Sequence, residues 1–168
     1  MIGAIIGDVV GSRFEFDNYK SKDFEMFDKE CDFTDDSVMT LAIAKALQTY
    51  ETIINYESFK TELVAVMHEV GMRYPHCGYG GRFCVWMMKN HTEPYNSYGN
   101  GSAMRVAPVG WFANSLEECE ALAVATAEVT HNHPEGIKGA VAVAGAIYLA
   151  RIGKTMDEIK EYISKFYT

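Results

Sequence analysis

The chain has 168 residues, 48% of them hydrophobic and 23% charged, which is enough to bury the core of one globular domain over residues 1–168. Its formal net charge of -8 argues against binding a nucleic-acid duplex, because such surfaces require clustered Lys and Arg. No apolar run reaches the roughly 18 residues of a membrane span, and the four cysteines lack the paired spacing of a zinc site. We therefore expect a cytoplasmic protein with reduced thiols and no membrane association.

The first half of the chain is expected to contain helices joined by long loops. Residues 2–12 form the first predicted helix, and the polar, aromatic and aperiodic residues 14–33 indicate a long ordered loop. Apolar residues at helical spacing predict helices over residues 36–52 and 56–72. A shorter helix is predicted over residues 82–89.

The second half begins with another long loop, residues 90–102, which is followed by a short buried helix over residues 102–113, interrupted at Pro108. Capping-box patterns at Ser115 and Thr155, and Pro134 in a first turn, mark the start of further helices. These helices are predicted over residues 116–130, 134–152 and 156–166. No run alternates long enough for a clear strand, although residues 53–56 fit either state, so the predicted fold is an all-α, compact multi-helix bundle.

Phe33-Thr34-Asp35-Asp36-Ser37 is the most informative segment, because it sets two adjacent carboxylates between hydroxyl groups. Carboxylate and hydroxyl oxygens are hard donors of the kind that Mg²⁺, Mn²⁺ or Ca²⁺ prefers. The same residues precede a predicted helix, and for the motif taken alone a helix cap at Thr34 or Asp35 is the more common explanation. The motif alone leaves both interpretations open.

Three further clusters carry groups of chemical interest. Asp8 interrupts an apolar helix and needs either a partner or a polar cleft, and Glu15 follows it at the start of the long loop. The segment Gly99-Asn100-Gly101-Ser102-Ala103-Met104-Arg105 offers backbone N–H groups that suit a diphosphate, or it is a plain turn. His131 and His133 are spaced for a transition metal, but helix capping or ligand hydrogen bonding explains them as well.

Taken together, residues 3–15, 33–40, 99–105 and 130–131 resemble the ADP-ribosylglycohydrolase family in order and spacing over essentially the whole chain. This family includes the ADP-ribosyl-arginine and ADP-ribosyl-serine hydrolases. The resemblance implies an all-α fold that binds up to two divalent cations, Mg²⁺ or Mn²⁺, beside a cleft for ADP-ribose. The implied reaction is Mg²⁺-dependent hydrolysis of a glycosidic bond to ADP-ribose in a modified protein or small molecule.

The resemblance also implies roles for individual residues. Glu15 and Asp35 would be catalytic, with Glu15 activating water, and Asp8 would support the metal site. Carboxylates near the reacting sugar suit this chemistry because positive charge develops there in the transition state. The metal ligands would be Thr34, Asp35 and Asp36. The ligand-binding residues would be Gly99, Asn100, Gly101, Ser102, Met104 and His131.

One departure from the family pattern affects these expectations. The family completes its metal site with a later Asp-x-Asp-Ser/Thr motif, and no Asp-x-Asp occurs in this sequence. The chain therefore resembles the N-terminal portion of the family fold. Three explanations are open: it is a fragment of a longer protein, a second polypeptide complements it, or it is a reduced homologue. An exposed apolar face would also favour a homodimer. The alternatives to an enzyme are a non-catalytic binder or sequestering protein for an ADP-ribose-type nucleotide, and a helical module with a vestigial site.

Overall fold

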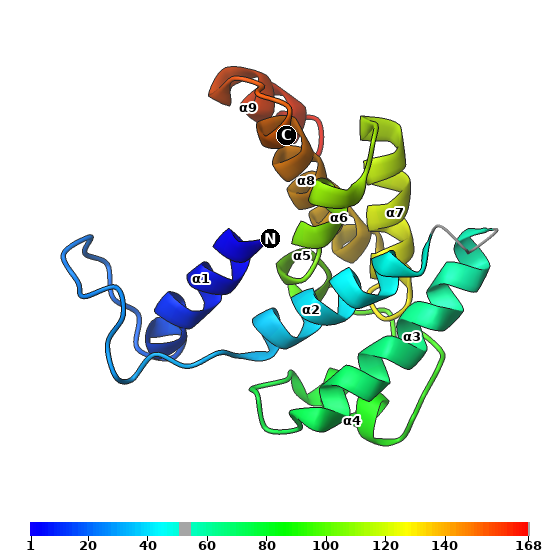
Figure 1. Cartoon of the computed structure of the whole chain (residues 1–168), viewed down its shortest axis with the longest axis horizontal. Helices are drawn as coiled ribbons and strands as arrows, with labels where there is room; N and C mark the ends of the chain where they lie inside the picture. Colours follow the sequence, from blue (N-terminus) through cyan, green and yellow to red (C-terminus); the bar gives the residue numbers. More distant parts are fainter. Residues whose placement is uncertain (51–54, 168) are drawn as a thin grey trace.

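A computed structural model describes residues 1–50 and 55–167, and helices provide its regular structure (Figure 1). No strand occurs within these ranges, so the all-α prediction is confirmed. The elements in chain order are α1 (Ile2–Gly11), the 3₁₀ turn η1 (Ser12–Phe14), α2 (Asp35–Gln48), α3 (Tyr56–Arg73), α4 (Gly81–Met88), α5 (Gly101–Met104), α6 (Ala107–Phe112), α7 (Leu116–Glu128), α8 (Pro134–Arg151) and α9 (Met156–Ser164).

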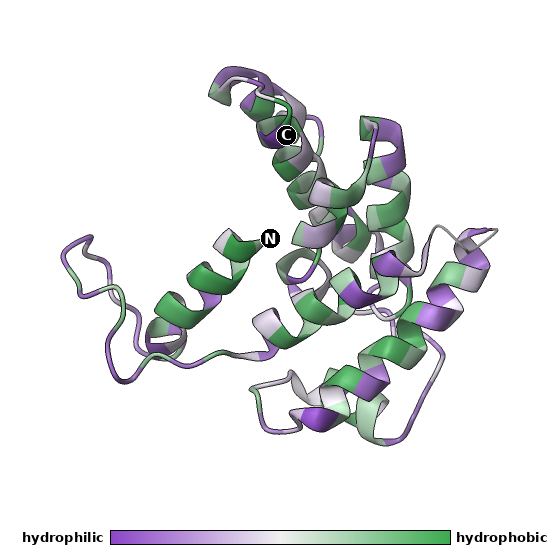
Figure 2. Ribbon diagram, in the orientation of Figure 1, coloured by the Kyte–Doolittle hydropathy of each residue, from purple (hydrophilic) through white to green (hydrophobic). Residues whose placement is uncertain are grey.

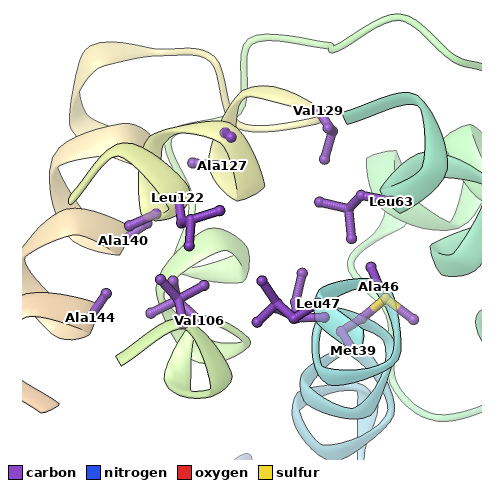
Figure 3. Close-up of a cluster of buried hydrophobic side chains, with 14 of the residues drawn as sticks. Met39, Ala46, Leu47, Leu63, Val106, Leu122, Ala127, Val129, Ala140 and Ala144 are labelled. Atoms are coloured by element: carbon purple, nitrogen blue, oxygen red, sulfur yellow. The ribbon is translucent and has the colours of Figure 1, made fainter. Parts of the chain in front are cut away.

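The core lies between α2 and α3 on one side and α7 and α8 on the other, with the short helices α5 and α6 between them. Figure 3 shows Leu47, Leu63, Val106 and Leu122 converging from these helices. Leu63, Val106 and Leu122 are completely buried, and removal of such a Leu side chain costs about 2–5 kcal/mol. The core therefore fixes α2 relative to the segment around α5, and these two parts carry most of the predicted site residues.

Helix α1 packs against α2 and stands apart from the α6–α9 body (Figure 1). Figure 2 shows that α1 is mostly hydrophobic, yet only Val10 in it is buried, and Ile2 is 71% exposed. An apolar cavity of about 570 Å³ lies between α1, α2 and α6, where Trp111 forms part of its wall. This cavity lacks convergent polar groups and is not the candidate site.

Most predicted helix boundaries agree with the structure to within a few residues, and one prediction is wrong. Residues 102–113 do not form one helix interrupted at Pro108. The break falls at Arg105 and Val106, because Pro108 lies in the first turn of α6, where its missing N–H costs no hydrogen bond. Helix α2 ends at Gln48 rather than residue 52, and the ambiguous residues 53–54 lie outside the described ranges.

The capping predictions are largely confirmed. Thr155 and Glu158 form a complete capping box at α9. At α7 the box is only half formed: Ser115 accepts the N–H of Glu118, but the Glu118 carboxylate accepts the N–H of Asn114. None of the helices described is long and apolar enough to cross a membrane.

Candidate functional site

Asp8 joins α1 to the start of α2. Its Oδ2 accepts the backbone N–H groups of Thr34 at 2.9 Å and Ser37 at 3.1 Å, and its Oδ1 accepts the Thr34 hydroxyl at 2.6 Å. Thr34 is also the N-cap of α2 and accepts the N–H of Asp36. The capping interpretation of Thr34 is therefore confirmed. Because its hydroxyl hydrogen is bound to Asp8, the Thr34 oxygen keeps a lone pair for a further partner.

A cavity of about 470 Å³ opens at this helix start, and we call it the carboxylate cavity. Residues with oxygen donors line it from α1, from η1 and its C-cap, from the start of α2 and from the N-cap of α5. These are Asp8, Ser12, Glu15, Thr34, Asp35, Asp36 and Asn100. Glycines form much of the remaining wall, and none of the described residues that line it is Lys, Arg or His. The cavity therefore collects negative charge without a protein cation.

Burial and mutual repulsion raise the pKa of both α2 carboxyl groups. Partial burial is the largest cause for Asp35, followed by the charges of Asp36, Glu15 and Asp8, and the pKa of Asp35 rises to about 6. The pKa of Asp36 rises to about 6 through burial and then the charges of Asp8 and Glu15. A bound cation would relieve this repulsion.

The carboxylates share a cavity without forming a closed metal site. Within residues 1–50 and 55–167, no three His, Cys, Asp or Glu side chains converge closely enough to hold a metal ion. The donor set suits a hard cation in charge and in chemistry. Such a cation would take part of its coordination from water or from a substrate.

A second cavity of about 280 Å³ adjoins the first, and we call it the glycine cavity. The two cavities share Asp35, Gly80, Asn100 and Met104. Gly101 lies so close to His131 that a Cβ at Gly101 would come within 2.8 Å of the His131 Nε2. The site is therefore elongated, with carboxylates at one end and a glycine turn against a histidine ring at the other.

His131 is buried beside the ring of Tyr95, at 5.9 Å between ring centroids. Its Nδ1 lies 2.8 Å from the hydroxyl of Thr130. Burial is the main reason that the pKa of His131 falls to about 3, and the charges of Arg105 and Arg82 lower it further. The imidazole is therefore neutral at physiological pH.

The structure brings most of the predicted site residues together. Glu15, Thr34, Asp35 and Asp36 line the carboxylate cavity; Gly99, Gly101 and His131 line the glycine cavity; Asn100 and Met104 line both. Ser102 is different, because its side chain is 1% exposed and donates to the carbonyl of Gly136 at 2.7 Å. Its hydroxyl holds α5 against α8. His133 is the N-cap of α8, in agreement with the capping alternative.

Several residues of the site were not predicted from the sequence. The backbone N–H of Asp35 donates to the carbonyl of Cys77, which brings the segment after α3 against the start of α2. Gly78 there has a φ of +89° and lies beside the Asp35 carboxylate, a backbone conformation that favours glycine. The glycine-rich run at 78–81 was the available signal. Arg82 and Tyr95 carry no comparable signal in the sequence.

Comparisons with known proteins identify the family of this chain. The profile of the ADP-ribosylglycohydrolase family matches residues 1–168. ADP-ribosylhydrolase ARH3 of Bos taurus is 27% identical over 94% of this chain and 50% of its own length. The proteins of the same name from Mus musculus and Homo sapiens are 30% and 29% identical over 75% of this chain and 36% and 37% of their own lengths. The chain thus spans half or less of the length of these relatives. It belongs to the ADP-ribosylglycohydrolase family.

Proposed function

We propose that this chain takes part in the Mg²⁺-dependent hydrolysis of a glycosidic bond to ADP-ribose in a modified protein or small molecule. The observation that carries the proposal is the carboxylate cavity, in which oxygen donors gather without a cationic side chain and continue into the glycine cavity. The similarity to proteins named ADP-ribosylhydrolase supports the same reaction class. These relatives are at least twice as long as this chain.

Thr34, Asp35 and Asp36 would hold the divalent cation. They follow one another at the start of α2 and line one cavity, and Asp8 orients the Thr34 hydroxyl. When bound, Mg²⁺ or Mn²⁺ would offset the carboxylate repulsion and anchor the hydroxyl groups of the ribose. Up to two ions fit the charge of this donor set.

Glu15 is the proposed general base. It lies at the exposed side of the carboxylate cavity, where water has access, while Asp35 and Asp36 lie deeper in the fold. Its carboxylate would accept a proton from the water whose oxygen bonds to C1″ of the ribose. The bond from C1″ to the leaving nitrogen or oxygen breaks, and the leaving atom takes up a proton. Nearby carboxylates also stabilise the positive charge that develops on the sugar.

The glycine cavity would hold the diphosphate and the rest of the nucleotide. Gly99 has no side chain, so a ligand can approach the backbone of the Gly-Asn-Gly turn closely there, whereas the His131 ring fills the space beside Gly101. Met104 and Tyr95 supply apolar surface in the same cavity. ADP-ribose is elongated, and so is the combined site.

Release of ADP-ribose from peptides modified on arginine or on serine tests this proposal. With Mg²⁺ present, we expect product from the wild-type chain, loss of product with Asp35→Ala, and a large loss with Glu15→Gln. Asp17→Asn is the control, because it removes an exposed carboxylate outside both cavities. If the wild-type chain binds ADP-ribose but releases none from any substrate, the proposed hydrolytic activity is contradicted.

That outcome would instead support the second candidate, a non-catalytic binder of an ADP-ribose-type nucleotide. The observation that favours it is that no three potential metal-ligating side chains converge in the described part of the chain. Calorimetry with ADP-ribose then separates a binder, which gives a saturable heat, from a vestigial site, which gives none.

A further inference from the structure

Arg105 is a buried cation that forms no ion pair with a carboxylate of the residues that the structure describes. It lies between α5 and α6, its side chain is 0% exposed, and its Nε and Nη1 atoms have no hydrogen-bond partner among the described residues. Its Nη2 donates to the carbonyl of Thr126 at 3.1 Å and to the hydroxyl of Thr130 at 2.8 Å. Burial lowers the pKa of Arg105 only to about 10, so it stays charged at neutral pH. A buried unpaired charge is costly, which calls for a specific role.

The bond from Arg105 determines which way the neighbouring hydrogen bond runs. Thr130 is fully buried, and its hydroxyl oxygen already accepts a hydrogen bond from Nη2 of Arg105. The hydroxyl hydrogen needs an acceptor, and within the described residues the one in reach is Nδ1 of His131, at 2.8 Å. The opposite arrangement would leave this hydrogen buried without a partner, a penalty of about 1–3 kcal/mol.

The proton of the neutral His131 ring is therefore on Nε2. This atom faces the glycine turn, because a Cβ at Gly101 would lie 2.8 Å from it and a Cβ at Gly99 would lie 4.0 Å from it. No acceptor for Nε2 is present in residues 1–50 and 55–167, and His131 lines the glycine cavity. The ring therefore offers the cavity a hydrogen-bond donor.

We propose that Arg105 is a positioning residue that, through Thr130, fixes His131 as the Nε2–H tautomer, so that the glycine cavity selects a ligand group that accepts a hydrogen bond. This inference rests on the proposed function and deepens it. The acceptor on an ADP-ribose-type ligand is a phosphate oxygen, a ribose oxygen or an unprotonated ring nitrogen. An ammonium or guanidinium group at the same place is excluded, because it has no acceptor.

The charged and titratable groups around His131 favour the neutral ring. Arg82 and Arg105 lie near enough to disfavour a third positive charge. Tyr95 is uncharged at neutral pH, and burial raises its pKa above the ordinary value. Asp35 also lines this cavity. The ring thus keeps one tautomer across the physiological pH range. A protonated ring would need Thr130 as an acceptor for both the arginine and the histidine.

Nitrogen-15 NMR of the histidine rings tests the tautomer directly and needs no ligand. The His131 signals are assigned by their absence in His131→Gln. In the wild type we expect Nδ1 to have the chemical shift of an unprotonated ring nitrogen and Nε2 that of a protonated one. Thr130→Val removes the hydroxyl at nearly constant volume and should shift the ring toward the other tautomer, while Thr130→Ser keeps the hydroxyl and should preserve the wild-type pattern. A protonated Nδ1 in the wild type would overturn the proposal.

Calorimetry with ADP-ribose and Mg²⁺ then tests the consequence for binding. Thr130→Val should weaken binding about tenfold, and Thr130→Ser by less than about threefold. Arg105→Met is the second variant, and it should change the tautomer in the same direction as Thr130→Val. Equal affinity of Thr130→Val and the wild type would overturn the selective role of the ring. Failure of the wild type to bind ADP-ribose would contradict the proposed function, whereas the NMR result would still decide the tautomer.

Discussion

The hydroxyl of Thr34 donates to Oδ1 of Asp8 at 2.6 Å, and this contact joins the first helix of the chain to the helix that carries the candidate metal ligands. The other Asp8 oxygen accepts two backbone N–H groups at the start of α2. One carboxylate therefore caps α2, orients Thr34 and fixes α1 beside the carboxylate cavity. Asp8 acts through Thr34 rather than as an isolated charge.

Asp8→Asn should lower the free energy of unfolding by about 1–3 kcal/mol, because the amide has one acceptor oxygen where three donors now converge. Urea denaturation monitored by circular dichroism measures this loss. Asp17→Asn is the matched control, since Asp17 is exposed and lies outside both cavities. Equal stability of Asp8→Asn and the wild type would show that the capping contacts contribute nothing.

Asp35→Asn should stabilise the fold when a chelator removes divalent cations, in contrast to the destabilising Asp8→Asn. The substitution removes a partly buried charge that other carboxylates repel, so the melting temperature should rise by a few degrees. Added Mg²⁺ should stabilise the wild type and leave the variant nearly unchanged. Thermal melts in chelator and in Mg²⁺ measure both effects, and a lower melting temperature of the variant in chelator would contradict the account.

The pH dependence of stability follows from the same carboxylates. Folding raises the pKa of Asp35 and Asp36 from an ordinary value of 3.8 to about 6, so the folded state binds more protons than the unfolded state between these values. Their contribution to the unfolding free energy is therefore highest below about pH 4 and is lost as the pH rises through 6. Each should contribute about 1 kcal/mol, because partial exposure screens the full shift.

The measurement is the unfolding free energy in chelator at pH 5 and at pH 7.5, for the wild type and for the double variant Asp35→Asn, Asp36→Asn. Other groups titrate in both proteins, so the difference between the two proteins isolates these carboxylates. We expect the variant to gain stability over the wild type as the pH rises. A difference that is constant with pH would contradict the raised pKa values.

Alanine substitutions at two glycines of α8, Gly145 and Gly139, form a matched pair that tests how the last helix packs. A Cβ at Gly145 would overlap the hydroxyl of Tyr162. This hydroxyl donates to the carboxylate of Glu120 and so links α9 to α7. Gly145→Ala should therefore destabilise the fold by about 2 kcal/mol or more. Gly139→Ala meets only ordinary contacts, with the Cβ of Ala103 at 3.7 Å and the hydroxyl of Tyr167 at 3.9 Å, and should stabilise α8 by about 0.5–1 kcal/mol. Urea denaturation of both variants tests the pair. A stabilising Gly145→Ala would contradict this packing.

Local signals made much of the fold predictable. Helical periodicity, the cap at Thr155 and the first-turn proline at Pro134 placed the long helices, because these features depend on neighbouring residues. The helix break near Pro108 was misplaced, because a proline fits either the end of one helix or the first turn of the next. In the structure Pro108 lies in the first turn of α6, after Val106 as the N-cap.

The acidic part of the site was predictable for a different reason. Asp8 and the Thr34-Asp35-Asp36 segment are polar residues beside apolar runs, which marks them for a cap, a cleft or a metal. Ser102 was predicted to contact the ligand, but it lies against α8, because side-chain direction in a short helix depends on its neighbours. The bond from Arg105 to Thr130 spans 25 positions and left no sequence signal.

Binding of a divalent cation by Thr34, Asp35 and Asp36 is the central claim, and a Mn²⁺ titration followed by electron paramagnetic resonance tests it most directly. The account predicts saturable Mn²⁺ binding by the wild type, competition by Mg²⁺, and loss of binding in Asp35→Asn with Asp17→Asn unchanged. Equal Mn²⁺ binding by Asp35→Asn and the wild type, or none by either protein, would contradict it.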